Sequence, residues 1–166
     1  WSSDVCSSDL ARLVMPPPAG AAKNWAAYRS RFVEPAHIRD GLRFWADNQR
    51  WLDAAQTRWG VPPEIVTAIV GVETFYGRIR GGYRVLDALA TLSFDFPKGR
   101  SDRSAFYRAE LAAFLTWCRA EGRDPTSVKG SYAGAIGLPQ FMPSSIRADA
   151  IEDRKSTRLN SSHEWI

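Results

Sequence analysis

Residues 61–77 read VPPEIVTAIVGVETFYG, a stretch that carries the start and stop signals of a helix and one carboxylate, Glu73, in its apolar part. The two prolines stand where the first turn of a helix tolerates them. Glu64 follows them, where a negative charge is favourable near the positive end of the helix dipole. Gly77 supplies a stop signal. The pattern therefore predicts a helix that begins at the prolines and ends at Gly77.

Glu73 stands on an apolar face of this predicted helix. Residues three, four and seven positions before it share its face, and these are Val70, Ile69 and Val66. A carboxylate that projects from such a face is poorly solvated when ionised, so we expect the protonated acid to persist toward neutral pH. An acid held in this way can protonate a leaving group and later take a proton back. The alternative is that Glu73 reaches solvent or an arginine beyond the helix end, such as Arg78.

The rest of the chain predicts further helices and a glycine-rich loop, so the predicted fold class is mainly α. No stretch alternates apolar and polar residues long enough to indicate a sheet. Residues 124–145 are rich in glycine and proline and predict a structured loop that leads into another helix. The expected helices are one or two turns within 24–35, then 37–60, 83–97 and 102–122, with Gly60, Pro97 and Gly122 as their stops.

Composition fits one soluble globular domain. The chain has 166 residues, of which 45% are hydrophobic and 24% charged, and no apolar run approaches the roughly 20 residues that span a bilayer. The net charge of +4 suits an anionic partner, but the basic residues are scattered and no nucleic-acid motif accompanies them. We therefore expect a solvated basic surface and no nucleic-acid partner.

Both ends of the chain differ from the rest. Residues 1–10 and 154–166 are polar, rich in serine and without periodicity, and they resemble translated sequencing-adapter read-through. The alternative is a pair of genuine disordered tails. Without these ends Cys118 is the only cysteine and His37 the only histidine, so neither a disulfide nor a Cys- or His-based metal site is predicted.

Several motifs in a fixed order carry a family resemblance. They are WGVPPEIVTAIVGVET, YGR, RVLDALATLSFDFP, ELAAFL, DP and KGSYAGAIGLPQFMPSS, and they extend over roughly 125 residues. In these motifs the chain resembles the membrane-bound lytic murein transglycosylase B family, which is glycoside hydrolase family 103. The resemblance implies a lysozyme-like catalytic domain at 25–153, after a Pro/Gly-rich linker at 11–24.

The resemblance also implies the site residues. Glu73 matches the family's catalytic acid/base, Ser131 matches the serine that positions this carboxyl, and Gln140 matches a polar residue of the sugar cleft. Tyr76 and Tyr132 stand beside these motif residues and are candidates to bind substrate. For Ser131 the alternative is a turn-forming hydroxyl, and for Gln140 it is a side chain that satisfies local backbone groups.

One carboxylate suffices for the reaction that the resemblance implies. Ordinary glycosidases need two, whereas Asp87 and Asp95 are better explained as structural and turn residues. Glu73 would protonate the oxygen between N-acetylmuramic acid and N-acetylglucosamine in peptidoglycan. It would then deprotonate the muramoyl 6-hydroxyl, which closes a 1,6-anhydro ring. The alternatives are a muramidase that uses water and an inactive module that binds the cell wall.

The chain departs from the family pattern in two ways. Leu138 and Pro139 stand where relatives often have an aromatic residue and glycine. The match also ends near residue 153, before a structural calcium loop of the family, so we expect a chain that is incomplete on its C-terminal side and that has little or no activity by itself. No cofactor is expected for the chemistry. The resemblance implies peptidoglycan glycan strands as the partner, a periplasmic or outer-membrane location, and possible membrane anchoring of the intact protein.

Overall fold

The computed structural model describes residues 24–30 and 32–148, which fall into two units. The N-terminal unit holds the described residues up to Ile79, and the C-terminal unit holds those from Arg80 onward. The adapter-like ends and nearly all of the linker predicted at 11–24 lie outside the described residues. Their boundaries, and the single domain at 25–153, stay predictions. No described helix has the length and apolar character to cross a membrane.

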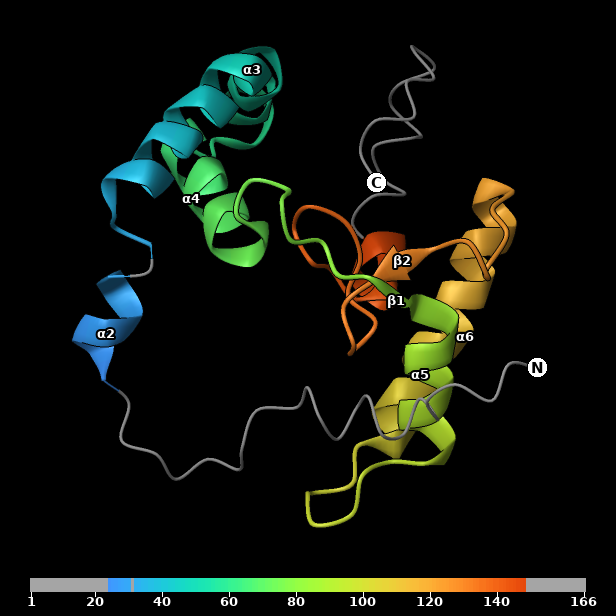
Figure 1. Ribbon diagram of the computed structural model, residues 1–166. Coiled ribbons are helices and arrows are strands. Elements are labelled where there is room, and N and C mark those ends of the chain that lie inside the picture. The colour runs from blue at the N-terminus through green and yellow to red at the C-terminus, as the bar shows by residue number, and fades with distance from the viewer. Residues whose placement is uncertain (1–23, 31, 149–166) are drawn as a thin grey trace. The chain divides into compact units, whose positions relative to one another are not determined.

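The N-terminal unit is built from α2 (Trp25–Ser30), α3 (Pro35–Trp59) and α4 (Pro63–Thr74), of which α3 and α4 pack side by side (Figure 1). The short α2 buries none of its residues. The helix α3 ends where the sequence predicts. Gly60 takes a left-handed φ of 70° and its N–H bonds to the carbonyl oxygen of Gln56, a conformation that glycine adopts without a steric cost.

The helix α4 begins at Pro63 but ends at Thr74, three residues before the predicted stop at Gly77. Phe75 and Tyr76 both take left-handed φ values, 50° and 57°. The side chain of Thr74 is fully buried and stabilises this ending, because its hydroxyl donates to the carbonyl oxygen of Val70 and accepts the N–H of Gly77. A side chain thus satisfies the backbone groups that the predicted glycine stop was expected to serve.

The C-terminal unit is built on two packed helices, α5 (Val85–Phe94) and α6 (Ser104–Glu121), which lie side by side in Figure 1. Gly122 closes α6 in a left-handed conformation, as predicted. The helix α5 stops before the predicted Pro97, because the residue before a proline is disfavoured in the helical region. The core between the helices consists of Val85, Leu89, Leu92, Tyr107, Phe114, Trp117 and Cys118, with Val128 and Ile136 from the loops.

A two-stranded antiparallel sheet joins the start of α5 to the loop after α6. Its strands are β1 (Tyr83–Arg84) and β2 (Lys129–Gly130), and the N–H of Val85 bonds to the carbonyl oxygen of Val128 beside it. The expectation of no sheet was wrong, because strands of two residues are too short to show an alternating pattern. The mainly α fold class is confirmed, and residues 143–148 form the helix predicted after the loop.

Candidate functional site

Glu73 lies one residue before the end of α4 and its side chain is exposed. It is one residue, about 100° of helix rotation, from Thr74, which is fully buried. Of the residues predicted to share its face, Ile69 is 49% exposed, Val66 is half-buried and Val70 is buried. The apolar face on which the expected poor solvation of Glu73 depends is therefore only partly covered in this unit.

An exposed apolar stripe runs along α4 beside Glu73. Ile65, Ile69 and Val72 are spaced by four and three residues, which places them on one face of the helix. They are 50%, 49% and 42% exposed. The buried residues of α4 are Pro63, Thr67, Val70, Gly71 and Thr74. The carboxylate is thus accessible at the end of a helix whose two isoleucines are exposed.

The Tyr76 side chain turns back from the end of α4 into the contact between α3 and α4. A Cβ atom built on Gly41 of α3 would lie 2.6 Å from the Tyr76 hydroxyl oxygen, and one on Gly71 of α4 would lie 2.7 Å from it. The His37 ring lies 4.8 Å away, centroid to centroid. Burial, with a smaller effect from the charge of Asp40, raises the pKa of Tyr76. The structure thus places this predicted substrate-binding hydroxyl between two helices.

Arg78, the alternative partner of Glu73, is paired elsewhere. Its guanidinium contacts the carboxylate of Asp40 on α3 at 3.0 Å. The two side chains are 63% and 29% exposed, so the pair contributes roughly 0.2–1 kcal/mol. The ion pair joins the turn after α4 to α3. It also neutralises the Asp40 carboxylate, which stands on the same unit as Glu73.

Ser131 organises the glycine-rich loop of the C-terminal unit. Its hydroxyl oxygen accepts the N–H groups of Ala133 and Ala135 at 3.3 and 3.0 Å. Its backbone N–H bonds to the carbonyl oxygen of Ala135, and its carbonyl oxygen accepts the N–H of Gly134. These are the bonds of a turn-forming hydroxyl, as the alternative predicted. Both side-chain bonds use the oxygen as an acceptor, so the hydroxyl proton can still be donated to a ligand.

The same loop packs its backbone tightly against the protein. Gly134 has a φ of 85°, and a Cβ there would overlap the side chain of Leu89 on α5. A Cβ on Gly130 would overlap the carbonyl oxygen of Ala135. These two glycines are therefore needed for contacts within the protein itself.

Gln140 closes the loop from its other end. Its side-chain nitrogen donates to the carbonyl oxygens of Gly137 and Arg80, at 2.8 and 3.3 Å, so local backbone satisfaction is what the structure shows. Its backbone has a φ of 51° and lies next to the bridge between Ile136 and Phe141. The amide oxygen keeps its acceptor capacity. Tyr132, which is half-buried, is on the same loop beside Ser131.

The predicted site residues therefore fall into two groups. Glu73 and Tyr76 belong to the N-terminal unit, whereas Ser131, Tyr132 and Gln140 belong to one loop of the C-terminal unit. The structure brings the three loop residues together through backbone bonds within 130–141. Their functional roles stay predictions.

Glu110 is a buried carboxylate that the sequence analysis did not single out. It lies on α6 with 4% of its surface exposed, and it accepts bonds from the backbone N–H of Ser144 at 2.9 Å and from its hydroxyl at 2.6 Å. Ser144 is the second residue of the helix at 143–148, whose first N–H groups lack partners within that helix. The signal was a glutamate inside the apolar ELAAFL motif, which requires a partner when it is buried.

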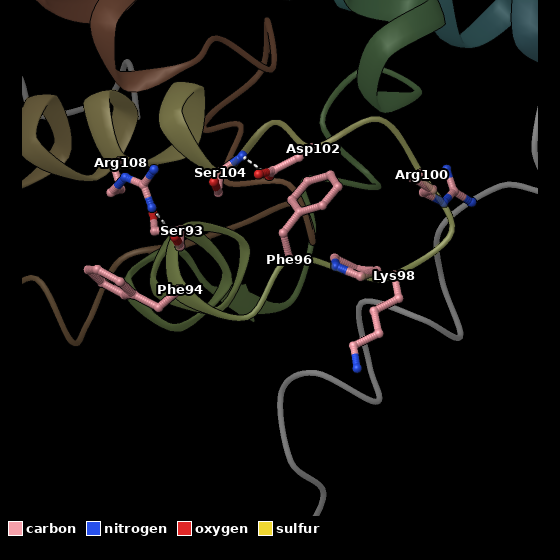
Figure 2. A pocket seen from close by; sticks show the side chains of 9 residues that line it. Ser93, Phe94, Phe96, Lys98, Arg100, Asp102, Ser104 and Arg108 are labelled. Carbon is pink, nitrogen blue, oxygen red and sulfur yellow. Dashed lines mark hydrogen bonds between the residues drawn. The ribbon is translucent and has the colours of Figure 1, made fainter.

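A shallow pocket of about 300 Å³ lies between the end of α5 and the start of α6 (Figure 2). Its polar groups already serve the helix ends. The Arg108 side chain donates to the carbonyl oxygen of Ser93, and the Asp102 carboxylate accepts the N–H of Ser104, which lowers the pKa of Asp102. None of the predicted site residues lines this pocket. We therefore assign the pocket a structural role.

Asp87, for which the sequence predicted a structural role, pairs with Arg84 at 2.7 Å. Within residues 24–30 and 32–148, no three His, Cys, Asp or Glu side chains are grouped so that they could hold a metal ion.

Residues 6–164 match the sequence model of a family that is described as "Transglycosylase SLT domain". The chain belongs to this family. It is 45% identical over 144 residues to the membrane-bound lytic murein transglycosylase B of Escherichia coli K12. The matched region covers 87% of this chain and 39% of that protein. The recognised family is thus confirmed, and the chain spans well under half the length of this curated relative.

Solved structures have the same fold. The soluble lytic transglycosylase SltB1 of Pseudomonas aeruginosa matches with a TM-score of 0.79 and 48% identity, over 87% of this chain and 48% of that one. Escherichia coli Slt35, solved in complex with calcium, matches with a TM-score of 0.75 and 43% identity, over 84% of this chain and 43% of that one. The predicted lysozyme-like transglycosylase fold is confirmed by these likenesses.

A more distant relative was solved with a piece of peptidoglycan. SltB3 of Pseudomonas aeruginosa, in complex with NAG-NAM-pentapeptide, matches with a TM-score of 0.72 and 27% identity, over 86% of this chain and 36% of that one.

Proposed function

We propose that the chain supplies the acid/base part of a lytic transglycosylase, which cleaves the β-1,4 bond between N-acetylmuramic acid and N-acetylglucosamine and leaves 1,6-anhydromuramic ends. Membership in the SLT family and the names of the relatives support this activity. The observation that carries it is the exposed Glu73, in the motif GVETFYG, at the end of α4. A carboxyl group at this point can reach a glycan strand.

The reaction requires Glu73 to move one proton in each direction. As an acid it protonates the glycosidic oxygen, and the leaving N-acetylglucosamine departs with that proton. As a base it then takes the proton of the muramoyl 6-hydroxyl, whose oxygen attacks C1 of the same sugar. The nucleophile is tethered to its target, so this step has the high effective concentration of an intramolecular reaction.

The pairing of two carboxylates, one in each unit, supports a single acid/base. Asp40 is held by Arg78 at 3.0 Å, and Asp87 is held by Arg84 at 2.7 Å. Each carboxylate thus has a guanidinium partner within its own unit. We therefore propose neither as the second carboxyl group that an ordinary glycosidase needs.

Ser131, Tyr132 and Gln140 are proposed as substrate-binding residues of the glycine-rich loop. The Ser131 hydroxyl proton and the Gln140 amide oxygen are the groups that the loop's own bonds leave available. They would bond to sugar oxygens and hydroxyls respectively. The further role that the resemblance implies for Ser131, which is to position Glu73, stays a prediction. Tyr132 would contribute an aromatic face beside them.

A muramidase is the second candidate, and the exposure of Glu73 is the observation that favours it. Water can reach an exposed carboxyl group, whereas a lytic transglycosylase must exclude water from the cationic sugar. In the muramidase Glu73 activates water instead of the 6-hydroxyl. The two activities use the same residue and differ only in the nucleophile.

Digestion of purified murein followed by mass spectrometry tests the proposal. Each anhydro end is lighter than a reducing end by one water. We expect anhydro ends from the intact protein that contains this chain and no new ends from its Glu73→Gln variant. A digest with reducing ends alone would identify the muramidase. Binding of murein without any cleavage would identify the third alternative, a wall-binding module.

The location and the partners follow from the proposed substrate. Peptidoglycan strands place the intact protein in the periplasm or at the outer membrane, and one relative is described as membrane-bound. We propose glycan strands as the partner and no nucleic acid. No cofactor takes part in the proposed proton transfers. Calcium, which was bound in the Slt35 structure, would have a structural role at most.

A further inference from the structure

The end of α4 has an unusual backbone that something must hold in place. Phe75 and Tyr76 are consecutive, neither is glycine, and both are left-handed, with φ values of 50° and 57°. L-residues with side chains avoid this region because the Cβ atom approaches the following carbonyl oxygen. Glu73 lies two residues before this turn. The groups that hold the turn therefore also determine where the helix that carries Glu73 ends.

The Tyr76 ring is the largest of the groups that hold the turn after α4. Its hydroxyl oxygen lies where Gly41 of α3 and Gly71 of α4 have no side chain, and both glycines are buried. The rings of His37 and Phe44, both on α3, lie 4.8 and 5.7 Å from the Tyr76 ring. Each helix thus provides a glycine at the hydroxyl, while α3 also provides aromatic contacts along the ring.

Two polar contacts hold the same turn. The buried Thr74 hydroxyl bonds to Val70 on one side and to the N–H of Gly77 on the other. Arg78 pairs with Asp40 of α3 at 3.0 Å. The turn is therefore attached to α3 both at Tyr76 and at Arg78, and Glu73 lies directly before the attached segment.

We propose that Tyr76 is a positioning residue, whose ring fixes the end of α4 against α3 and so directs Glu73, and that it does not bind the glycan. This inference rests on the proposed function of Glu73. It replaces the substrate-binding role predicted for Tyr76. The hydroxyl that a sugar contact would use is directed between the two helices at Gly41 and Gly71.

Alanine variants of the two glycines form a matched pair, because the added Cβ atoms would lie at different distances from the atoms of the same ring. A Cβ on Gly41 would lie 2.6 Å from the hydroxyl oxygen, 3.0 Å from Cζ and 3.6 Å from Cε1. A Cβ on Gly71 would lie 2.7, 2.8 and 2.9 Å from these three atoms. Tyr76→Phe removes only the oxygen. It should therefore remove the shortest overlap of the Gly41→Ala methyl group. The Gly71→Ala methyl group would still overlap two carbon atoms of the ring.

The experiment measures kcat and KM on murein for the wild type, for the three single variants and for both double variants. We expect Gly41→Ala to lower kcat by about tenfold to a hundredfold, since a small displacement of a catalytic group has effects of this size. Adding Tyr76→Phe should restore kcat to within about threefold of the Tyr76→Phe single variant, whereas Gly71→Ala should show no such rescue. Tyr76→Phe alone should leave KM unchanged.

Two outcomes overturn the proposal. One is a rise in KM of about tenfold for Tyr76→Phe with kcat unchanged, which is the signature of a lost sugar contact. The other is additivity of Gly41→Ala and Tyr76→Phe, because groups that do not touch have independent effects.

The thermal unfolding midpoints of the same six proteins separate this proposal from the proposed function. Alanine is a better helix former than glycine, and the shortest contact of Gly41→Ala is to the hydroxyl, so Gly41→Ala should be less destabilising once the hydroxyl is removed. If no protein cleaves murein, the proposed function is what fails. Rescue of the midpoint at Gly41 but not at Gly71 would then still support the ring contact, and additivity at both would overturn it.

Discussion

The Glu110 carboxylate on α6 accepts two hydrogen bonds from Ser144, one from the backbone N–H at 2.9 Å and one from the hydroxyl at 2.6 Å. Ser144 follows the glycine-rich loop, and the helix at 143–148 starts beside it. A buried carboxylate at a helix start satisfies N–H groups that have no partner in the helix and suits the positive end of its dipole. The end of the loop is thereby attached to the core of the C-terminal unit.

Replacement of Glu110 should destabilise the chain without removing any proposed catalytic group. We expect Glu110→Ala to lower the free energy of unfolding by about 2 kcal/mol, because both hydrogen bonds to Ser144 are lost and a cavity is left at a buried position. Glu110→Gln keeps one acceptor oxygen and should have a smaller effect. Ser144→Ala removes only the hydroxyl bond, about 1 kcal/mol. Urea denaturation followed by circular dichroism measures all three, and equal stability of the Ala and Gln variants would contradict the capping role.

Replacement of Glu73 should remove the activity without destabilising the chain. Because the side chain is exposed, Glu73→Gln should change the free energy of unfolding by no more than about 0.5 kcal/mol. It should nevertheless abolish the release of anhydro-muropeptides. Glu64→Gln, an exposed glutamate in the first turn of the same helix, is the matched control and should remain active. Activity that survives in Glu73→Gln would refute the acid/base assignment.

Two glycines of the C-terminal unit have the same φ angle, so their alanine variants distinguish backbone strain from steric overlap. Gly134 and Gly99 both have a φ of 85°, but a Cβ on Gly134 would overlap Leu89 whereas one on Gly99 meets nothing within 4 Å. Gly99→Ala should cost about 1 kcal/mol for the left-handed backbone alone. Gly134→Ala adds the overlap with a buried leucine and should cost roughly 1–3 kcal/mol more. Equal unfolding free energies for the two variants would show that the loop does not pack on α5 in this way.

Asp102 should contribute a pH-dependent part of the stability. The N–H of Ser104 bonds to its carboxylate and lowers the pKa of Asp102 in the folded chain. A carboxyl with a lowered pKa stabilises the fold above its unfolded value, and this contribution is lost as the pH falls through the folded value. The urea midpoints of wild type and Asp102→Asn should therefore differ at pH 7 and converge as the pH falls through the folded value. A difference that persists in acid would point to another cause.

The sequence predicted most of the fold because local signals act within a few residues. Gly60 and Gly122 end α3 and α6 as expected, since each lies in the left-handed conformation that glycine adopts freely. The short strands at 83–84 and 129–130 could not be predicted. They are two residues long, and their pairing joins positions far apart in the chain.

The candidate site was predicted by motif and only partly by physical chemistry. The motifs led to the family, which the comparisons confirm. Within the N-terminal unit Glu73 is exposed although Val70 on its face is buried, because the sequence shows which residues share a helical face but not which of them are covered. For Ser131 and Gln140 the local alternatives describe the observed bonds, because both side chains satisfy backbone groups within reach of their own loop.

The sequence by itself determined the helices, the family and the residue on which the proposed chemistry depends. These follow from helix-boundary signals, from the spacing of apolar residues and from the order of motifs. Only the tertiary structure decided that α4 ends at Thr74, that Glu73 is exposed and that the Tyr76 hydroxyl lies between Gly41 and Gly71. Each of these depends on which surfaces of two helices meet. The space beside a residue is set by groups that are distant in sequence, and no local pattern records it.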